Sequence, residues 1–154
     1  MAELPYHAAI MSAAHRASGK GRLESPDASA TVDNPLCGDR VTVDIRREGP
    51  RGKGGRVSEI GHVVRGCVLC EAAAVVIVEA GTGAAEADLR AASDRVRRML
   101  ERDGPPPGGE WKKAEMFIPV RPHPSRHDCV LLPFQALLEA VSYTHLTLPT
   151  KRIV

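Results

Sequence analysis

Three of the four cysteines lie where a thiol can do chemistry. Cys37 lies in a stretch rich in glycine and proline, Cys67 follows a glycine at a predicted helix start, and Cys129 precedes another predicted helix. The start of a helix carries unpaired N–H groups and a partial positive charge, and both favour the thiolate, which binds metal or attacks sulfur. With the carboxylate of Asp39, the three thiolates would form a tetrahedral set of donors for Zn²⁺, or for a [2Fe–2S] cluster with one weak ligand.

The spacing of these cysteines leaves a second interpretation open. The intervals from Cys37 to Cys67 and from Cys67 to Cys129 are long and irregular, unlike the paired C-x-x-C motifs of zinc ribbons. Buried, inert cysteines are therefore the alternative to a shared site. The fourth cysteine, Cys70, stands one helical turn after Cys67, so both side chains can point the same way. It is either an auxiliary ligand or sulfur relay, or a small residue buried on an apolar helix face.

Composition restricts the classes of function. The 154 residues suffice for one domain with a core, and 43% hydrophobic and 26% charged residues are ordinary for a soluble globular protein. The net charge of +2 is too small to indicate a nucleic-acid partner. The longest apolar run, residues 72–78, is far shorter than the roughly 18 residues of a membrane span. The N-terminus has no recognisable signal-peptide layout, which predicts a cytoplasmic protein. In such a protein, cysteines predict thiol or metal chemistry rather than disulfides.

The elements that must position these residues can be predicted from periodicity. Alternating apolar residues predict strands at 41–46 and 57–64, which we expect to pair as a hairpin after a short strand at 29–33. Residues 104–109 are dominated by glycine and proline and predict an exposed connection. The last helix follows Cys129, with Pro133 tolerated only in its first turn, so that Cys129 lies near its N-terminal end. The other expected elements are helices at 6–17, 67–80 and 84–102 and a short apolar segment at 116–120.

The last thirteen residues, SYTHLTLPTKRIV, differ from the rest of the chain. They contain three threonines, as many as residues 1–141 together, and switch from a helical pattern to β-branched alternation. The segment is similar to the translation of a sequencing adapter. We therefore predict a domain at 1–141 and a foreign or disordered tail at 142–154, with a natural frayed tail as the alternative.

Three motifs resemble those of the IscU/NifU/SufU scaffolds for iron–sulfur cluster assembly. Residues 34–40 (NPLCGDR) are similar to the first-cysteine motif of that family. Residues 66–74 (GCVLCEAAA) are similar to the second motif, and residues 125–129 (SRHDC), which lead into a leucine-rich helix, to the third. The order of the motifs and of the expected elements agrees over roughly residues 6–141. The first motif is highly specific, and the other two are moderately so.

The resemblance implies a fold, a site and partners. The fold is α+β, with a small antiparallel sheet of about three strands flanked by helices. Members receive sulfur from a cysteine desulfurase, assemble a transient [2Fe–2S] cluster and pass it to iron–sulfur acceptor proteins. Cys37, Cys67 and Cys129 become ligands of iron or zinc, and Asp39 becomes the fourth ligand. A carboxylate is a harder and more exchangeable donor than a thiolate, so it would keep a bound cluster labile.

Departures from the pattern leave two functions open. The IscU type has a histidine directly before the third cysteine, where this chain has Asp128, and its chaperone-recognition motif is not visible. The long segment between the second and third cysteines is closer to the SufU layout, which resembles a zinc-holding sulfur acceptor. Either the chain is a non-enzymatic scaffold, or it is a zinc-dependent sulfurtransferase in which Cys67 or Cys129 accepts sulfur from the desulfurase. A closed structural zinc domain is the third alternative.

Two kinds of residue near the motifs are weaker candidates. His62 and His127 can act as ligands, although a solvated or hydrogen-bonded imidazole is the default interpretation. Arg40, Arg65 and Arg126 flank the three motifs, where they either offset the negative charge of the thiolates or are simply solvated.

Overall fold

Three antiparallel strands form one sheet in the order β1-β2-β3. The computed structural model describes residues 4–35, 38–49 and 55–146. In the central strand, Val41, Val43 and Ile45 are fully buried, because alternate residues of a strand point to the same face. The elements in chain order are α1 (Leu4–Arg16), β1 (Ala28–Asn34), β2 (Asp39–Arg47), β3 (Val57–Arg65), α2 (Val68–Gly81), α3 (Glu86–Glu101), the 3₁₀ helix η2 (Gly109–Val120) and α4 (Pro124–Leu146).

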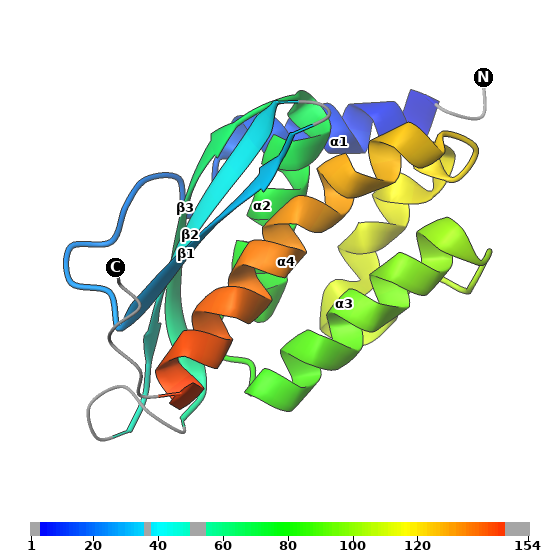
Figure 1. Cartoon of the computed structure of the whole chain (residues 1–154). Coiled ribbons are helices and arrows are strands. Elements are labelled where there is room, and N and C mark those ends of the chain that lie inside the picture. The colour runs from blue at the N-terminus through cyan, green and yellow to red at the C-terminus, as the bar shows by residue number, and fades with distance from the viewer. Residues whose placement is uncertain (1–3, 36–37, 50–54, 147–154) are drawn as a thin grey trace.

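The helices form layers on one side of the sheet (Figure 1). Helix α4 packs on β1 and β2, and α2 packs on β3, so these two helices cover the sheet and also contact each other. Helix α1 packs on α2, and α3 forms an outer layer against α4. The aromatic rings of Trp111 in η2 and Phe134 in α4 contact each other, with centroids 5.8 Å apart. The predicted α+β fold, with a three-stranded antiparallel sheet flanked by helices, is confirmed.

Helix α4 begins earlier than the sequence predicted. It starts at Pro124, which places Cys129 at the sixth residue and Pro133 at the tenth, well inside the helix. The prediction that Pro133 lies in the first turn is therefore wrong. A proline in a helix interior removes one hydrogen bond and costs about 3 kcal/mol. The helix continues because it buries the large side chains of Leu131, Leu132 and Phe134, each worth about 1.5–3 kcal/mol.

Two other segments differ from the expectations. Residues 104–108 form neither helix nor strand, as predicted, but Pro107 is buried rather than exposed. The short apolar segment expected at 116–120 is the end of η2, whose Met116 and Phe117 are buried. Helix α4 passes the expected domain boundary, since it includes residues 142–146 and Arg90 donates a hydrogen bond to Ser142. Residues 147–154 lie outside the described residues, and the foreign origin of the tail stays a prediction.

One carboxylate connects three elements. Glu79 of α2 accepts hydrogen bonds from Arg16 of α1, Ser18 of the following segment and Lys113 of η2. The Arg16 guanidinium is the largest cause that lowers the pKa of Glu79 from 4.5 to about 2, against the opposing effect of burial.

Replacement of Glu79 by glutamine should lower the free energy of unfolding by about 1–2 kcal/mol near neutral pH, since its cationic partners are partly exposed and screened. A folded-state pKa below the unfolded one stabilises the protein above pH 4.5, and this contribution is lost as pH falls towards about 2. Urea unfolding across this pH range should show the wild type and Glu79→Gln converging at low pH. Asp94→Asn is the control, because its ion pair with Arg98 is exposed, and a pH-independent difference for Glu79→Gln would contradict the assignment.

Candidate metal and cluster site

Asp39 lies at the first residue of β2, directly after the turn from β1. Asn34 and Asp39 face each other as the last pair of the two strands, and the N–H of Gly38 donates a hydrogen bond to the carbonyl of Asn34. Gly38 has φ +76°, a left-handed conformation that glycine adopts readily. Cys37, which directly precedes Gly38 in the chain, lies outside the described residues.

The carboxylate of Asp39 is buried without full hydrogen bonding. Asp39 is only 6% exposed. Within residues 4–35, 38–49 and 55–146, its Oδ2 atom has no hydrogen-bond partner. A buried carboxylate oxygen without a partner costs free energy, so an orphaned oxygen here is typical of a site that receives a cation.

Cys67 occupies the N-cap of α2, as the sequence predicted. Its backbone is extended (φ −82°, ψ 172°), and its side chain makes no capping hydrogen bond. Cys67 is partly exposed and lies at the N-terminal end of the helix.

Cys129 lies in a different environment from the one predicted. The favourable effect of the helix dipole on a thiolate is concentrated in the first turn of a helix. Cys129 is the sixth residue of α4 and lies beyond that turn. It is 3% exposed. Burial raises the pKa of the Cys129 thiol, and the neighbouring Cys67 and Asp39 raise it further. A raised pKa favours the protonated thiol, so a metal that binds Cys129 must displace the proton.

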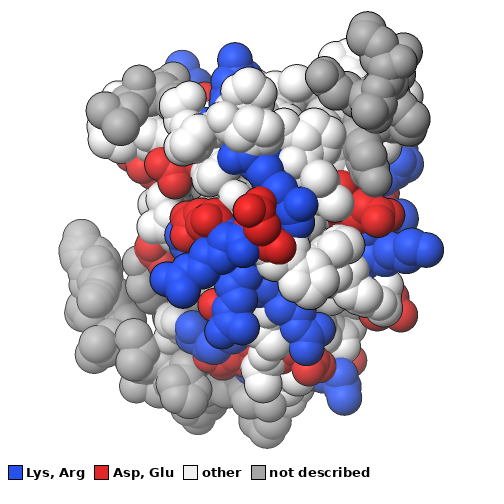
Figure 2. Space-filling model, turned by 90° about the vertical axis from the view of Figure 1, so that its right-hand side faces the viewer, with Lys and Arg blue, Asp and Glu red and all other residues white. Residues whose placement is uncertain are grey.

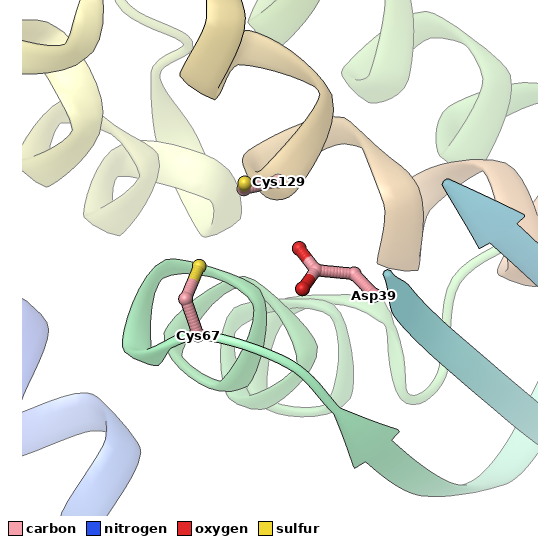
Figure 3. Close-up of side chains that lie close together, drawn as sticks. All are labelled: Asp39, Cys67 and Cys129. Carbon is pink, nitrogen blue, oxygen red and sulfur yellow. The ribbon is translucent and has the colours of Figure 1, made fainter. Parts of the chain in front are cut away.

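The three side chains meet although they come from different parts of the chain (Figure 3). The donor atoms of Asp39, Cys67 and Cys129 all lie within 4.8 Å of one another. They project from the start of β2, the connection after β3 and the side of α4, respectively. Two soft sulfurs and one hard oxygen suit Zn²⁺ or the iron of a cluster, and the set leaves room in a tetrahedral shell for one further ligand.

Cys70 is separated from this group. It is fully buried in the hydrophobic core, although it follows Cys67 by one turn. Cys67 is the N-cap and has an extended backbone, so the spacing of three residues does not bring its side chain onto the helix face of Cys70. The interpretation as a buried small residue thus fits the structure better than an auxiliary ligand.

The two histidines also lie outside the group of donor atoms. The Nε2 atom of His62 lies 2.8 Å from the carbonyl oxygen of Ser18, and Nε2 of His127 lies 3.0 Å from that of Arg121. Both imidazoles are buried and support the backbone, as the default interpretation held.

Two of the three arginines near the motifs lie beside Asp39. Arg40 and Arg65 line a surface hollow of about 450 Å³ that also reaches Asp39. Arg40 forms an ion pair with Asp33 at 2.6 Å, whereas Arg126 is exposed.

On the face that includes α3, basic and acidic side chains alternate (Figure 2), and three i,i+4 ion pairs lie along this helix. None of the helices in the described part of the chain is both long and apolar enough to cross a membrane.

The sequence reasoning did not foresee the role of Gly66. A Cβ atom at this position would lie 2.6 Å from Oδ1 of Asp39. The signal was present in the sequence, since a glycine stands between a predicted strand and the second cysteine.

Comparisons with known proteins agree with this fold. A model of the NifU-like N-terminal domain matches residues 5–107. The chain is 25% identical over 136 residues to the iron–sulfur cluster assembly scaffold protein IscU of Streptococcus pyogenes serotype M1, an alignment that covers 88% of this chain and 82% of that protein.

Solved structures show the same architecture. The N-terminal NifU-like protein of Brucella abortus superposes with a TM-score of 0.83 and 34% identity, over 90% of this chain and 93% of that one. FiSufU of the thermophile Fervidobacterium islandicum AW-1 shares the fold, with a TM-score of 0.76 and 21% identity over 86% and 93% of the two chains. The chain belongs to the NifU-like N-terminal domain family, and thus to the iron–sulfur cluster assembly scaffolds, which confirms the resemblance.

Proposed function

We propose that this chain binds iron and sulfide as substrates at Cys37, Asp39, Cys67 and Cys129, and hands the resulting cluster to acceptor proteins. The observation that carries the proposal is the convergence of two thiols and a buried, partly unpartnered carboxylate within 4.8 Å. Cys37 is included because only one residue separates it from Asp39 and because of its motif. A cysteine desulfurase is the expected source of the sulfur.

The side chains would play unequal roles. Cys129 is buried, so its sulfur provides a donor protected from solvent once its proton is lost. Cys67 is partly exposed and faces incoming reactants. Asp39 contributes an oxygen that binds iron or zinc less tightly in a sulfur-rich shell, which allows the bound group to leave.

A zinc-dependent sulfur acceptor is the second candidate, and the position of Cys67 favours it. A partly exposed thiol at a helix N-terminus is suited to nucleophilic attack, whereas the Cys129 thiol is buried with a raised pKa. In this reaction the Cys67 thiolate attacks the outer sulfur of the desulfurase persulfide. A new S–S bond forms on Cys67, the old S–S bond breaks, and the desulfurase cysteine leaves as a thiolate.

The metal and acid-labile sulfide content of the anaerobically purified full chain distinguishes these functions. The sample would first be incubated with ferrous iron, free cysteine and a cysteine desulfurase. Iron with matching sulfide supports the scaffold, and zinc near one per chain without sulfide supports the sulfur acceptor. A chain that retains neither iron nor zinc would overturn both.

A further inference from the structure

We infer that Gly66 is a positioning residue, which holds the carboxylate of Asp39 towards the cysteines by leaving space beside it. The inference rests on the proposed function of the site. Gly66 connects the last residue of β3 to the N-cap of α2, and a Cβ built on it would lie 2.6 Å from Oδ1 and 2.8 Å from Cγ of Asp39. Both distances are much shorter than a van der Waals contact between such atoms. The carboxylate therefore occupies the volume that any side chain at residue 66 would need.

The requirement for glycine is one of space and not of backbone conformation. Gly66 is absent from the glycines with positive φ, so alanine can adopt its backbone angles without strain. Gly38, which directly precedes Asp39, shows the opposite case: it has φ +76°, and no atom of the described residues lies within 4 Å of its would-be Cβ. Two glycines next to the same carboxylate therefore serve different physical purposes.

Neither backbone can retreat easily from a methyl group at residue 66. Arg40 and Arg65, the chain neighbours of Asp39 and Gly66, face each other in the β2–β3 ladder. Gly66 is also followed directly by Cys67, whose carbonyl accepts a hydrogen bond from the first turn of α2. The ladder and the helix hold both positions, so the added methyl group displaces the Asp39 carboxylate by rotation of its side chain. The remaining contact of 3.1 Å with Cβ of Asp39 requires a shift of only a few tenths of an ångström.

Rotation of this carboxylate would alter the donor set. In its present orientation, Asp39 places a carboxylate oxygen within 4.8 Å of the sulfurs of Cys67 and Cys129. Its residue is 6% exposed, so protein surrounds it and few other orientations are available. Gly66 thus determines whether the site offers an oxygen to iron or zinc, and through it how readily that ion is exchanged.

The test compares Gly66→Ala with the same substitution at another glycine and with a variant that lacks the Asp39 carboxylate. Gly108→Ala is the matched control, because within the described part of the chain no atom lies within 4 Å of its would-be Cβ, and its φ is −102°. Asp39→Ala and the double variant Asp39→Ala/Gly66→Ala complete a double-mutant cycle. Each full-length protein would be titrated with Zn²⁺ against a chelator, and the visible spectrum of its Co²⁺ form would be recorded.

We expect Gly66→Ala to weaken Zn²⁺ binding about 10-fold and to change the Co²⁺ spectrum in the same direction as Asp39→Ala, whereas Gly108→Ala matches the wild type. In the Asp39→Ala background the same change should have less than about a 2-fold effect, since no carboxylate remains to be displaced. If Gly66→Ala alone does not fold, recovery of folding in the double variant supports a clash between the added methyl group and the Asp39 carboxylate.

Two results would overturn the inference. Either Gly66→Ala binds Zn²⁺ and Co²⁺ like the wild type, or it weakens binding equally with and without the Asp39 carboxylate. Both results require a wild type that binds metal, so they leave the proposed function intact. A wild type that binds no metal would instead remove the proposed function and the inference together.

Discussion

Alanine at Cys67 or Cys129 should weaken Zn²⁺ binding at least about 100-fold and abolish the retention of iron and sulfide. Four ligands together contribute roughly 10–16 kcal/mol to a zinc site, so the loss of one thiolate removes several kcal/mol. Both sulfurs lie within 4.8 Å of each other and of Asp39, and neither has a replacement donor among the described residues. Cys37→Ala should behave in the same way if that residue completes the site.

Cys70→Ala is the matched control for these variants. It removes a cysteine only one turn from Cys67, but one buried in the core and outside the group of donors. Metal and sulfide content after anaerobic reconstitution should match the wild type, with at most a modest loss of stability from the small cavity. The assignment would be wrong if Cys70→Ala lost the metal while Cys67→Ala retained it.

Asp39→Ala should slow the release of a reconstituted cluster about 10-fold. The carboxylate is the one hard donor among the described ligands, and its Oδ2 atom has no other partner in the described part of the protein. Without it, the cluster keeps its thiolates but loses the ligand that exchanges most readily. Release would be followed as transfer of the cluster to an apo-ferredoxin or to a chelator.

Asp33→Ala tests whether the loss of a negative charge near the site is enough to slow the release of the cluster. Asp33 is also an aspartate near the site, but it is exposed and pairs with Arg40 instead of belonging to the donor group. We expect release from this variant to match the wild type. Unaltered release from Asp39→Ala, or equal slowing in both variants, would argue against a ligand role for Asp39.

The central strand and the first motif could be predicted from sequence, because their signals are local. Val41, Val43 and Ile45 alternate with polar residues, and the pleat of a strand turns this alternation directly into a buried face. The turn before Asp39 could also be predicted, since Gly38 and its neighbours in the sequence favour a tight connection. The start of a helix at Cys67 was predicted from Gly66, which interrupts the preceding strand pattern.

The position of Cys129 within α4 could not be predicted in this way. Proline is a strong local signal against a helix interior, and the prediction gave it precedence at Pro133. In the folded protein, burial of the apolar side chains around it outweighs the loss of one hydrogen bond. Cys129 consequently lies in the second turn, buried and with a raised pKa, and not at a helix start that would favour its thiolate.

The amino-acid sequence by itself indicated which residues are candidates for the chemistry and in which local turns and strands most of them lie. Only the tertiary structure decided that Cys67 and Cys129 meet, because the packing of α2 against α4 brings together residues far apart in the chain. It also decided that Cys70 belongs to the core and that Gly66 leaves room for the Asp39 carboxylate. These are questions of volume and direction between elements, and a one-dimensional pattern contains neither.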